Sequence, residues 1–163
     1  MSPGTPGEGP FPAALAAEFE AIVARYPKRA AAMLPVLTRL QAERGFLSEE
    51  SVEQVAAFLE VSPAHVHGVV SFYSMYDRSP VGRHKLYVCR TLSCRLRGAE
   101  EVIRAMEEKL GVKRGGTTGD GKFTIVPFKC LGLCEQAPAV LCGEKRWGNL
   151  TPETAKKLLE ELA

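Results

Sequence analysis

The 163-residue sequence lacks several features by which classes of protein are recognised. No apolar run approaches the roughly 18 residues that a membrane-spanning helix requires. The 21 basic and 19 acidic residues nearly cancel, so charge gives no reason to expect nucleic acid or a membrane surface as a partner. The N-terminus has neither the basic start nor the apolar run of a signal peptide. We therefore expect a cytoplasmic protein without direct membrane insertion.

The usual motifs of catalysis and nucleotide binding are also missing. The sequence contains no nucleophile with a neighbouring base, no carboxylate pair and no NAD-binding fingerprint. A glycine-rich loop at residues 115–121 lacks the lysine-and-hydroxyl ending of a phosphate-binding loop and precedes an expected strand. We therefore expect no catalysis from the isolated chain.

Cysteine, by contrast, is concentrated in one part of the chain. Four of the five cysteines form two pairs: Cys89 and Cys94, separated by four residues, and Cys130 and Cys134, separated by three. Two loops distant in the sequence must converge to bring these thiols together. In a reducing compartment, clustered cysteines bind metal more often than they form disulfides.

The spacing of the two pairs favours an iron–sulfur site over two alternatives. Structural zinc sites usually contain at least one pair separated by two residues, and dithiol oxidoreductases usually present the same spacing, which neither pair here has. A pair separated by four residues begins the plant-type ferredoxin pattern, although the rest of that pattern differs. A zinc-stabilised interaction module and a thioredoxin-like dithiol enzyme stay open as alternatives.

The N-terminal half has the pattern of a small helical bundle. Residues 1–12, rich in proline and glycine, are expected to form a disordered tail. Residues 13–76 contain four amphipathic segments whose apolar residues recur at helical spacing. Ser48 and Ser62 are expected N-caps, and Pro35 either kinks the second helix or lies in its first turn.

One segment of this bundle is unusual. Residues 68–76 carry Phe72, Tyr73 and Tyr76 within five positions, together with Gly68 inside an expected helix. Glycine in a helix costs about 1 kcal/mol relative to alanine, so we expect Gly68 to pack closely against another segment. The aromatic residues belong either to a core between two domains or to a docking surface for a partner.

A linker at residues 77–83, which has no periodicity, separates the bundle from a second domain at residues 84–163. The pattern there changes to short strands and helices around a small sheet, which makes the fold class α+β. The expected elements are a strand at 84–90, a helix at 98–110, strands at 123–128 and 138–142, a turn at 146–150 and a final helix capped by Thr151.

Several of these segments resemble one known family. Four segments carry the resemblance: residues 68–73, Cys89 to Cys94 with the following 97–99, the loop at 118–123, and Cys130 to Cys134 with Ala137 and Pro138. They are similar to the small [2Fe–2S] subunit of the NADH dehydrogenase module of respiratory complex I. The resemblance covers nearly all of the chain after the tail and implies a thioredoxin-like [2Fe–2S] ferredoxin domain at residues 84–163. Related subunits of soluble NAD-dependent hydrogenases and formate dehydrogenases share the cysteine pattern.

The resemblance implies a cofactor, a function and a partner. It implies a [2Fe–2S] cluster held by Cys89, Cys94, Cys130 and Cys134, and one-electron transfer as a subunit of NADH:quinone oxidoreductase. The partner is then a larger flavoprotein subunit that binds NADH and FMN, and attachment to the inner membrane is peripheral, through partner subunits. The sequence leaves open a homodimer of the isolated chain. Cys142 matches no ligand position and is expected to be a small buried residue.

Residues beside the cysteines are expected to tune such a site. Gly98 and Gly132 have no Cβ, so we expect their backbone amides to approach the sulfur atoms and donate hydrogen bonds. Four cations lie close in sequence and either favour the reduced cluster or are ordinary solvated charges: Arg90, Arg95, Arg97 and Lys129.

Overall fold

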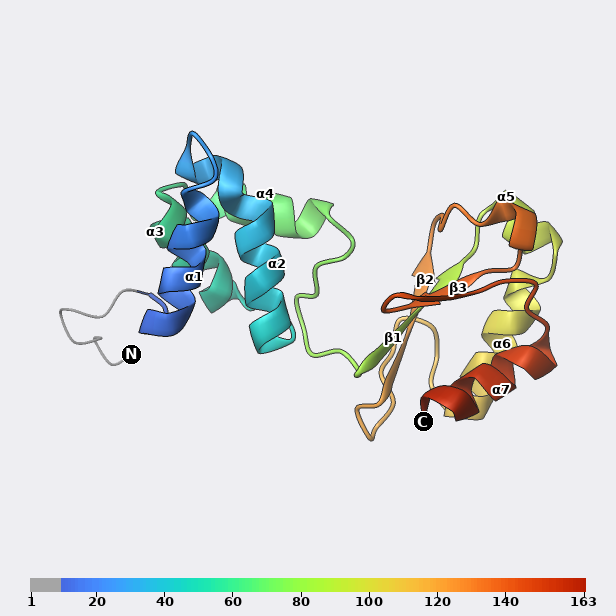
Figure 1. Ribbon diagram of the computed structural model, residues 1–163. Coiled ribbons are helices and arrows are strands. Elements are labelled where there is room, and N and C mark those ends of the chain that lie inside the picture. The colour runs from blue at the N-terminus through green and yellow to red at the C-terminus, as the bar shows by residue number, and fades with distance from the viewer. Residues whose placement is uncertain (1–9) are drawn as a thin grey trace. The chain divides into compact units, whose positions relative to one another are not determined.

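In the computed structural model, the chain forms two compact units, Met1–Pro80 and Val81–Ala163, and the structure describes residues 10–163 (Figure 1). Most of the expected tail at residues 1–12 lies outside the described residues. Phe11, which the sequence places at the end of that tail, is instead buried, with its ring edge-on to those of Phe19 and Phe58. An aromatic ring buries enough apolar surface to draw the end of the tail onto the core.

Two helices of the N-terminal unit begin where the sequence places N-caps. The Ser48 and Ser62 side chains accept hydrogen bonds from the backbone N–H groups of Ser51 and His65, as an N-cap does. Pro35 lies in the first turn of its helix, where a missing N–H costs nothing. The elements are α1 Ala13–Val23, the 3₁₀ helix η1 Arg29–Ala32, α2 Met33–Arg44, α3 Glu49–Leu59 and α4 Pro63–Phe72.

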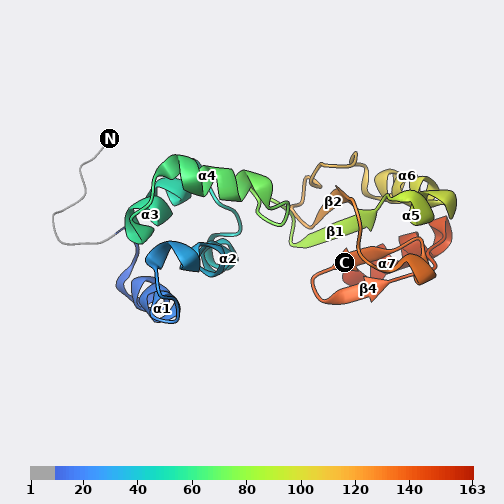
Figure 2. The ribbon, with the colours of Figure 1, turned by 90° about the horizontal axis from the view of Figure 1, so that it is seen from above.

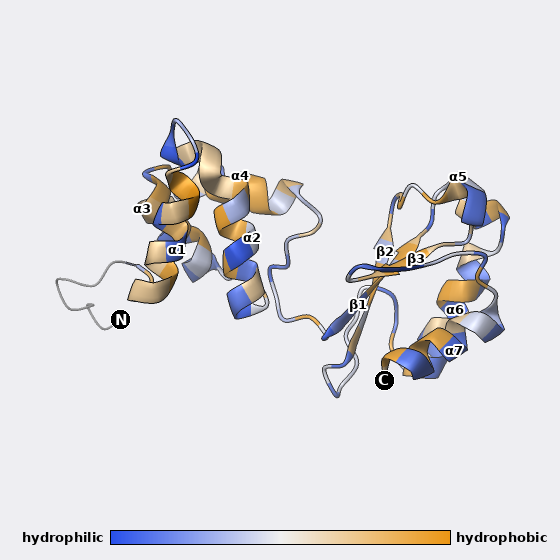
Figure 3. Cartoon of the chain, viewed as in Figure 1, coloured by the Kyte–Doolittle hydropathy of each residue, from blue (hydrophilic) through white to orange (hydrophobic). Residues whose placement is uncertain are grey.

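Apolar side chains from all four of these α-helices meet in one core. Figure 3 shows the apolar stretches that recur along the helices. Since none of the helices exceeds 12 residues, this shared burial rather than helix propensity stabilises them. The largest fully buried side chains of the unit are Phe19, Leu37, Leu40, Leu47 and Leu59.

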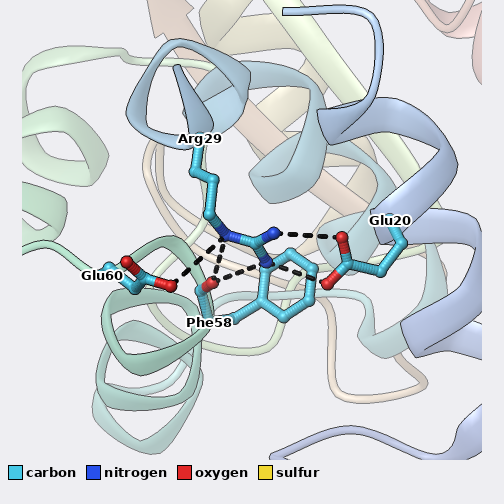
Figure 4. Close-up of polar contacts among 4 residues, drawn as sticks. All are labelled: Glu20, Arg29, Phe58 and Glu60. Atoms are coloured by element: carbon cyan, nitrogen blue, oxygen red, sulfur yellow. Dashed lines mark hydrogen bonds and ion pairs between the residues drawn. The ribbon is translucent and has the colours of Figure 1, made fainter. Parts of the chain in front are cut away.

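Arg29 links three segments at the edge of this core (Figure 4). Its guanidinium donates two hydrogen bonds to the Glu20 carboxylate, at 3.0 and 2.9 Å, and two to the Phe58 carbonyl oxygen, at 3.2 and 3.0 Å. It also lies 4.8 Å from the centre of the Phe58 ring. The hydrogen bonds from Arg29 lower the pKa of Glu20, and those to Glu20 raise the pKa of Arg29. The arginine thus joins α1, η1 and α3.

The face of α4 that carries Gly68 is not closely packed, contrary to expectation. Among the described residues, no atom outside the helix lies within 4 Å of the position that a Cβ on Gly68 would occupy. Phe72 is 80% exposed, and Tyr73 and Met75 are also exposed. The prediction of close packing at Gly68 is therefore wrong within the described chain, and this face offers an aromatic surface.

The C-terminal unit contains a four-stranded sheet in the order β2-β1-β3-β4. β1 His84–Cys89 pairs in parallel with β2 Phe123–Phe128, and β1 pairs antiparallel with β3 Val140–Cys142. The expected turn at 146–150 is partly wrong, because Lys145–Trp147 forms β4, which pairs with β3. Three residues are too few to show an alternating pattern. The helices are α5 Leu92–Leu96, α6 Ala99–Leu110 and α7 Pro152–Leu162, with a 3₁₀ turn η2 at Cys134–Gln136.

Two long helices cover one face of this sheet. Leu86 and Val88 of β1 share a buried cluster with Ile103 of α6 and Leu158 of α7, and Figures 1 and 2 show both helices beside the strands. Thr151 caps α7 as predicted, with a reciprocal hydrogen bond to Thr154. Helices packed on a small mixed sheet confirm the α+β fold class. None of the helices in residues 10–163 is long and apolar enough to cross a membrane.

Glu107 of α6 forms hydrogen bonds with Arg114 in the loop after the helix. We expect these bonds to make the free energy of unfolding depend on pH. Its buried carboxylate accepts hydrogen bonds from the Arg114 backbone N–H at 2.8 Å and from Arg114 Nε at 3.1 Å. The backbone hydrogen bond, followed by the side-chain hydrogen bond and against the effect of burial, lowers the pKa of Glu107 below its ordinary 4.5. We expect Glu107→Gln to reduce the free energy of unfolding by about 1–3 kcal/mol near neutral pH.

The sign of the pH effect follows from the lowered pKa of Glu107. Its stabilising contribution is complete above the ordinary pKa of 4.5 and is lost as the pH falls through the lower folded pKa. Urea denaturation of wild type and variant at about pH 7 and about pH 3 measures the difference. Glu108→Gln is the control, because Glu108 is exposed. Equal losses at both pH values would contradict this role.

Candidate metal centre

The two cysteine pairs meet at one edge of the sheet. β1 and β2 are parallel, so their carboxyl ends lie at the same edge, and Cys89 at the end of β1 stands opposite Phe128. Cys130 follows two residues after Phe128. The Cys89 N–H donates to the Ala139 carbonyl oxygen at 3.1 Å, which draws the segment before β3 to the same edge. Pairing of strands thus brings together loops that are distant in the sequence, as the two pairs require.

The first pair lies inside the unit. Cys89 is 2% exposed, and Cys94, carried by the short helix α5, is 1% exposed. Helix α5 is absent from the elements expected from the sequence, because five residues are too short to show a helical period. The side chains buried around the two thiols are small: they are those of Ala99, Ala137 and Ala139, and the partly buried Leu131 and Leu133 pack against them.

The second pair lies at the surface. Cys130 and Cys134 are both exposed, and Gly132 between them has a φ of +69°, a conformation that favours glycine. As expected, the Gly132 N–H donates to Cys130 Sγ, at 3.4 Å. The corresponding expectation for Gly98 is wrong: its N–H donates to the Arg95 carbonyl oxygen at 3.3 Å, in the turn that joins α5 to α6.

Hydrogen bonds favour a thiolate at Cys89. Burial by itself would raise the pKa of Cys89, but donors from the Thr91 hydroxyl and from the Thr91 and Leu131 backbone outweigh it and lower the pKa. The Thr91 oxygen lies 3.2 Å from Cys89 Sγ. When protonated, the Cys89 thiol donates to the Lys129 carbonyl oxygen at 3.3 Å. Leu131 and Lys129 flank Cys130, so these contacts join the two cysteine loops.

Cys94 is affected in the opposite direction. Burial, together with the hydrogen bond to Cys89, raises the pKa of Cys94 to about 11, although the Ala139 backbone N–H opposes this rise. The contact between the two thiols therefore lowers the pKa of Cys89 and raises that of Cys94. A metal centre binds both residues as thiolates, so its binding releases any proton that they carry.

The donor set fits an iron–sulfur core. Within residues 10–163, no three His, Cys, Asp or Glu side chains surround one point as a single metal ion would require. A [2Fe–2S] core contains two irons and takes four thiolates, two at each iron. Thiolates are the soft ligands that such a core selects, and N–H donors near the sulfurs offset its negative charge.

Cys142 lies in another part of the unit. Its side chain belongs to the core beneath α6 and α7 and not to the small cluster around Cys89 and Cys94. Burial raises the pKa of its thiol. Cys142 is a small buried residue, as predicted from its place at the end of an apolar strand.

The fold and the cysteine-rich edge define a small α+β protein with a thiol site at the carboxyl ends of parallel strands. The sequence profile described as "Thioredoxin-like [2Fe-2S] ferredoxin" matches residues 19–163, and the chain belongs to this family. The family carries a [2Fe–2S] cluster.

Several of its relatives are components of NADH-quinone oxidoreductases. The chain is 40% identical over 143 residues to such a component from Rhizobium meliloti, covering 88% of this chain and 85% of that protein. It is 38% identical over 148 residues to the corresponding component from Escherichia coli K12, covering 89% of each. These relatives support the NADH-quinone oxidoreductase interpretation better than the hydrogenase alternative.

Hydrogenase components also resemble this chain. It is 36% identical over 156 residues to the NADP-reducing hydrogenase subunit HndA of Solidesulfovibrio fructosivorans, covering 96% of this chain and 91% of that one. A solved structure of an NAD⁺-reducing [NiFe]-hydrogenase matches 77% of this chain with a TM-score of 0.66 and 20% identity, which shows a shared fold. The chain covers 22% of that hydrogenase chain.

Proposed function

We propose that Cys89, Cys94, Cys130 and Cys134 hold one [2Fe–2S] cluster, with Cys89 and Cys94 at one iron and the other pair at the second. When bound, the cluster supplies a centre that accepts and donates one electron. The observation that carries this proposal is the convergence of both pairs at one sheet edge, with hydrogen-bond donors aimed at their sulfur atoms.

The residues of this chain would then have distinct roles. The Thr91 hydroxyl and the Gly132 N–H donate to sulfur and offset negative charge, which favours the reduced state. The buried pair excludes water from one side of the site, whereas the exposed pair faces solvent. Exposure on one side gives an electron partner access to the centre.

We further propose an electron-transfer role within an NADH-quinone oxidoreductase, peripheral to the inner membrane through partner subunits. The site would exchange one electron with the FMN of a partner that binds NADH. The relatives that are components of NADH-quinone oxidoreductases support this assignment. HndA supports the alternative of an equivalent role in a soluble hydrogenase.

Anaerobic purification followed by metal analysis tests the cofactor. We expect two irons and two acid-labile sulfides per chain, and a spin-half EPR signal after dithionite reduction. Zinc in place of iron, or no reducible centre, would overturn the proposal in favour of a zinc-stabilised interaction module.

The aromatic surface on α4 and the segment after it is a proposed contact with the flavoprotein subunit. Phe72 is 80% exposed and Met75 is 49% exposed, and apolar and aromatic side chains of this kind are enriched at interfaces. We expect Phe72→Glu and Met75→Glu each to lower the amount of that subunit that co-purifies by about tenfold. Each variant would bury an unpaired carboxylate in the contact. Tyr26→Glu is the control. Unchanged co-purification of both variants would count against this contact.

A further inference from the structure

Two leucines beside the cysteine site point into solvent. Leu92 and Leu96 of α5 are 73% and 78% exposed, although burying a leucine side chain contributes about 1.5–3 kcal/mol. They are four residues apart and therefore lie on one face of the helix, whereas Cys94, midway between them, points to the opposite face. The same short helix thus buries a thiol on one face and exposes a leucine pair on the other.

The chain around this leucine pair is positively charged. No acidic residue occurs at positions 78–99 or 121–134. Three cations of the first segment, Arg90, Arg95 and Arg97, are exposed, and so is Lys129 of the second. Glu100, the acidic residue that follows the first segment, accepts a hydrogen bond from Arg114 Nη1 at 2.8 Å and also interacts with Arg90 and Arg95, so it offsets only part of this charge. The leucines therefore form an apolar patch with a basic edge.

We propose that Leu92 and Leu96, edged by Arg90, Arg95 and Arg97, form the surface on which the flavoprotein electron partner docks. This inference rests on the proposed function. The leucines match apolar side chains on the partner, and the positive charge of the three arginines favours carboxylates around those side chains. Docking there brings the partner within about one helix diameter, ~10 Å, of Cys94. The surface belongs to the C-terminal unit, whereas the aromatic surface on α4 belongs to the N-terminal unit.

Binding of the purified flavoprotein subunit to the full-length chain tests this surface. We expect Leu92→Ser/Leu96→Ser to raise the Kd about tenfold or more at any salt concentration, because the apolar contact is lost. We expect Arg95→Glu/Arg97→Glu to raise the Kd about tenfold at ~50 mM salt but much less at ~500 mM, because salt screens exposed charges. Arg25→Glu/Lys28→Glu changes the net charge equally at exposed positions outside both proposed surfaces and should leave the Kd unchanged.

Iron content and the EPR signal of each variant separate this inference from the proposed function. Cluster-loaded variants with the wild-type Kd would overturn the docking surface and leave the cluster assignment intact. Loss of iron from the leucine variant would give Leu92 and Leu96 a structural role instead, which also overturns the inference. A wild-type dimer that dissociates in the leucine variant would assign the patch to a second copy of this chain. A wild-type chain without iron would remove the proposed function itself.

Discussion

Replacing Cys94 by alanine is expected to abolish or remodel the [2Fe–2S] cluster. The thiol is 1% exposed and lies beside Cys89, so no water or surface side chain can readily take its place at the iron. Loss of one of four thiolates leaves a coordination position open. Iron content, visible absorbance and the EPR signal of anaerobically purified protein measure the effect, and we expect the wild-type spectrum to be absent.

Cys142→Ala is the matched control for this result. Cys142 is a buried cysteine of the same unit, but it lies in the core beneath α6 and α7, apart from the other four. We expect the Cys142→Ala protein to retain two irons and the wild-type spectrum, with a loss of unfolding free energy of about 1 kcal/mol for the smaller side chain. A colourless Cys142→Ala protein, or an unchanged spectrum in Cys94→Ala, would show that the ligand set is misassigned.

Replacing Phe19 by alanine is expected to destabilise the N-terminal unit by about 3–5 kcal/mol. The Phe19 ring is fully buried, lies 4.8 Å from the centre of the Phe11 ring and lies 5.6 Å from that of Phe58. Its removal leaves a cavity among these rings. Urea denaturation followed by far-UV circular dichroism measures the loss of helix, and visible absorbance follows the C-terminal unit in the same samples.

The same comparison tests whether the two units fold separately. We expect Phe19→Ala to shift the helical transition to lower urea while the visible absorbance persists, because the altered core belongs to the unit Met1–Pro80. Phe72→Ala is the control: the same change at an 80% exposed position should alter stability by no more than about 0.5 kcal/mol. A joint shift of both signals in Phe19→Ala would contradict separate folding.

Local sequence signals predict the elements that carry a clear pattern. Ser48 and Ser62 cap helices where expected, because a hydroxyl followed by an amphipathic run is a local signal. The strand that ends at Cys89 and the helix that ends before Gly111 are likewise predictable from periodicity. Elements of three to five residues, α5 and β4, escape such prediction because they span too little chain to show a period.

Other features are not accessible to local patterns. The composition of the residues before Phe11 is typical of disordered chain, so the sequence predicts that Phe11 belongs to the tail. Its burial depends instead on contacts with Phe19 and with Phe58, which is far along the sequence. Gly68 is expected to pack closely, yet that face of its helix is open among the described residues. Such contacts depend on the partners that the fold supplies, which no local window contains.

The sequence by itself determined the chemistry to expect of this protein: four thiols in two pairs, with spacings and flanking residues that belong to one family. Only the tertiary structure decided how the pairs differ. Parallel pairing of β1 with β2 places both pairs at one sheet edge, where Cys89 and Cys94 are buried while Cys130 and Cys134 are exposed. Burial and hydrogen bonding depend on contacts between distant segments, so residue type and spacing alone do not set them.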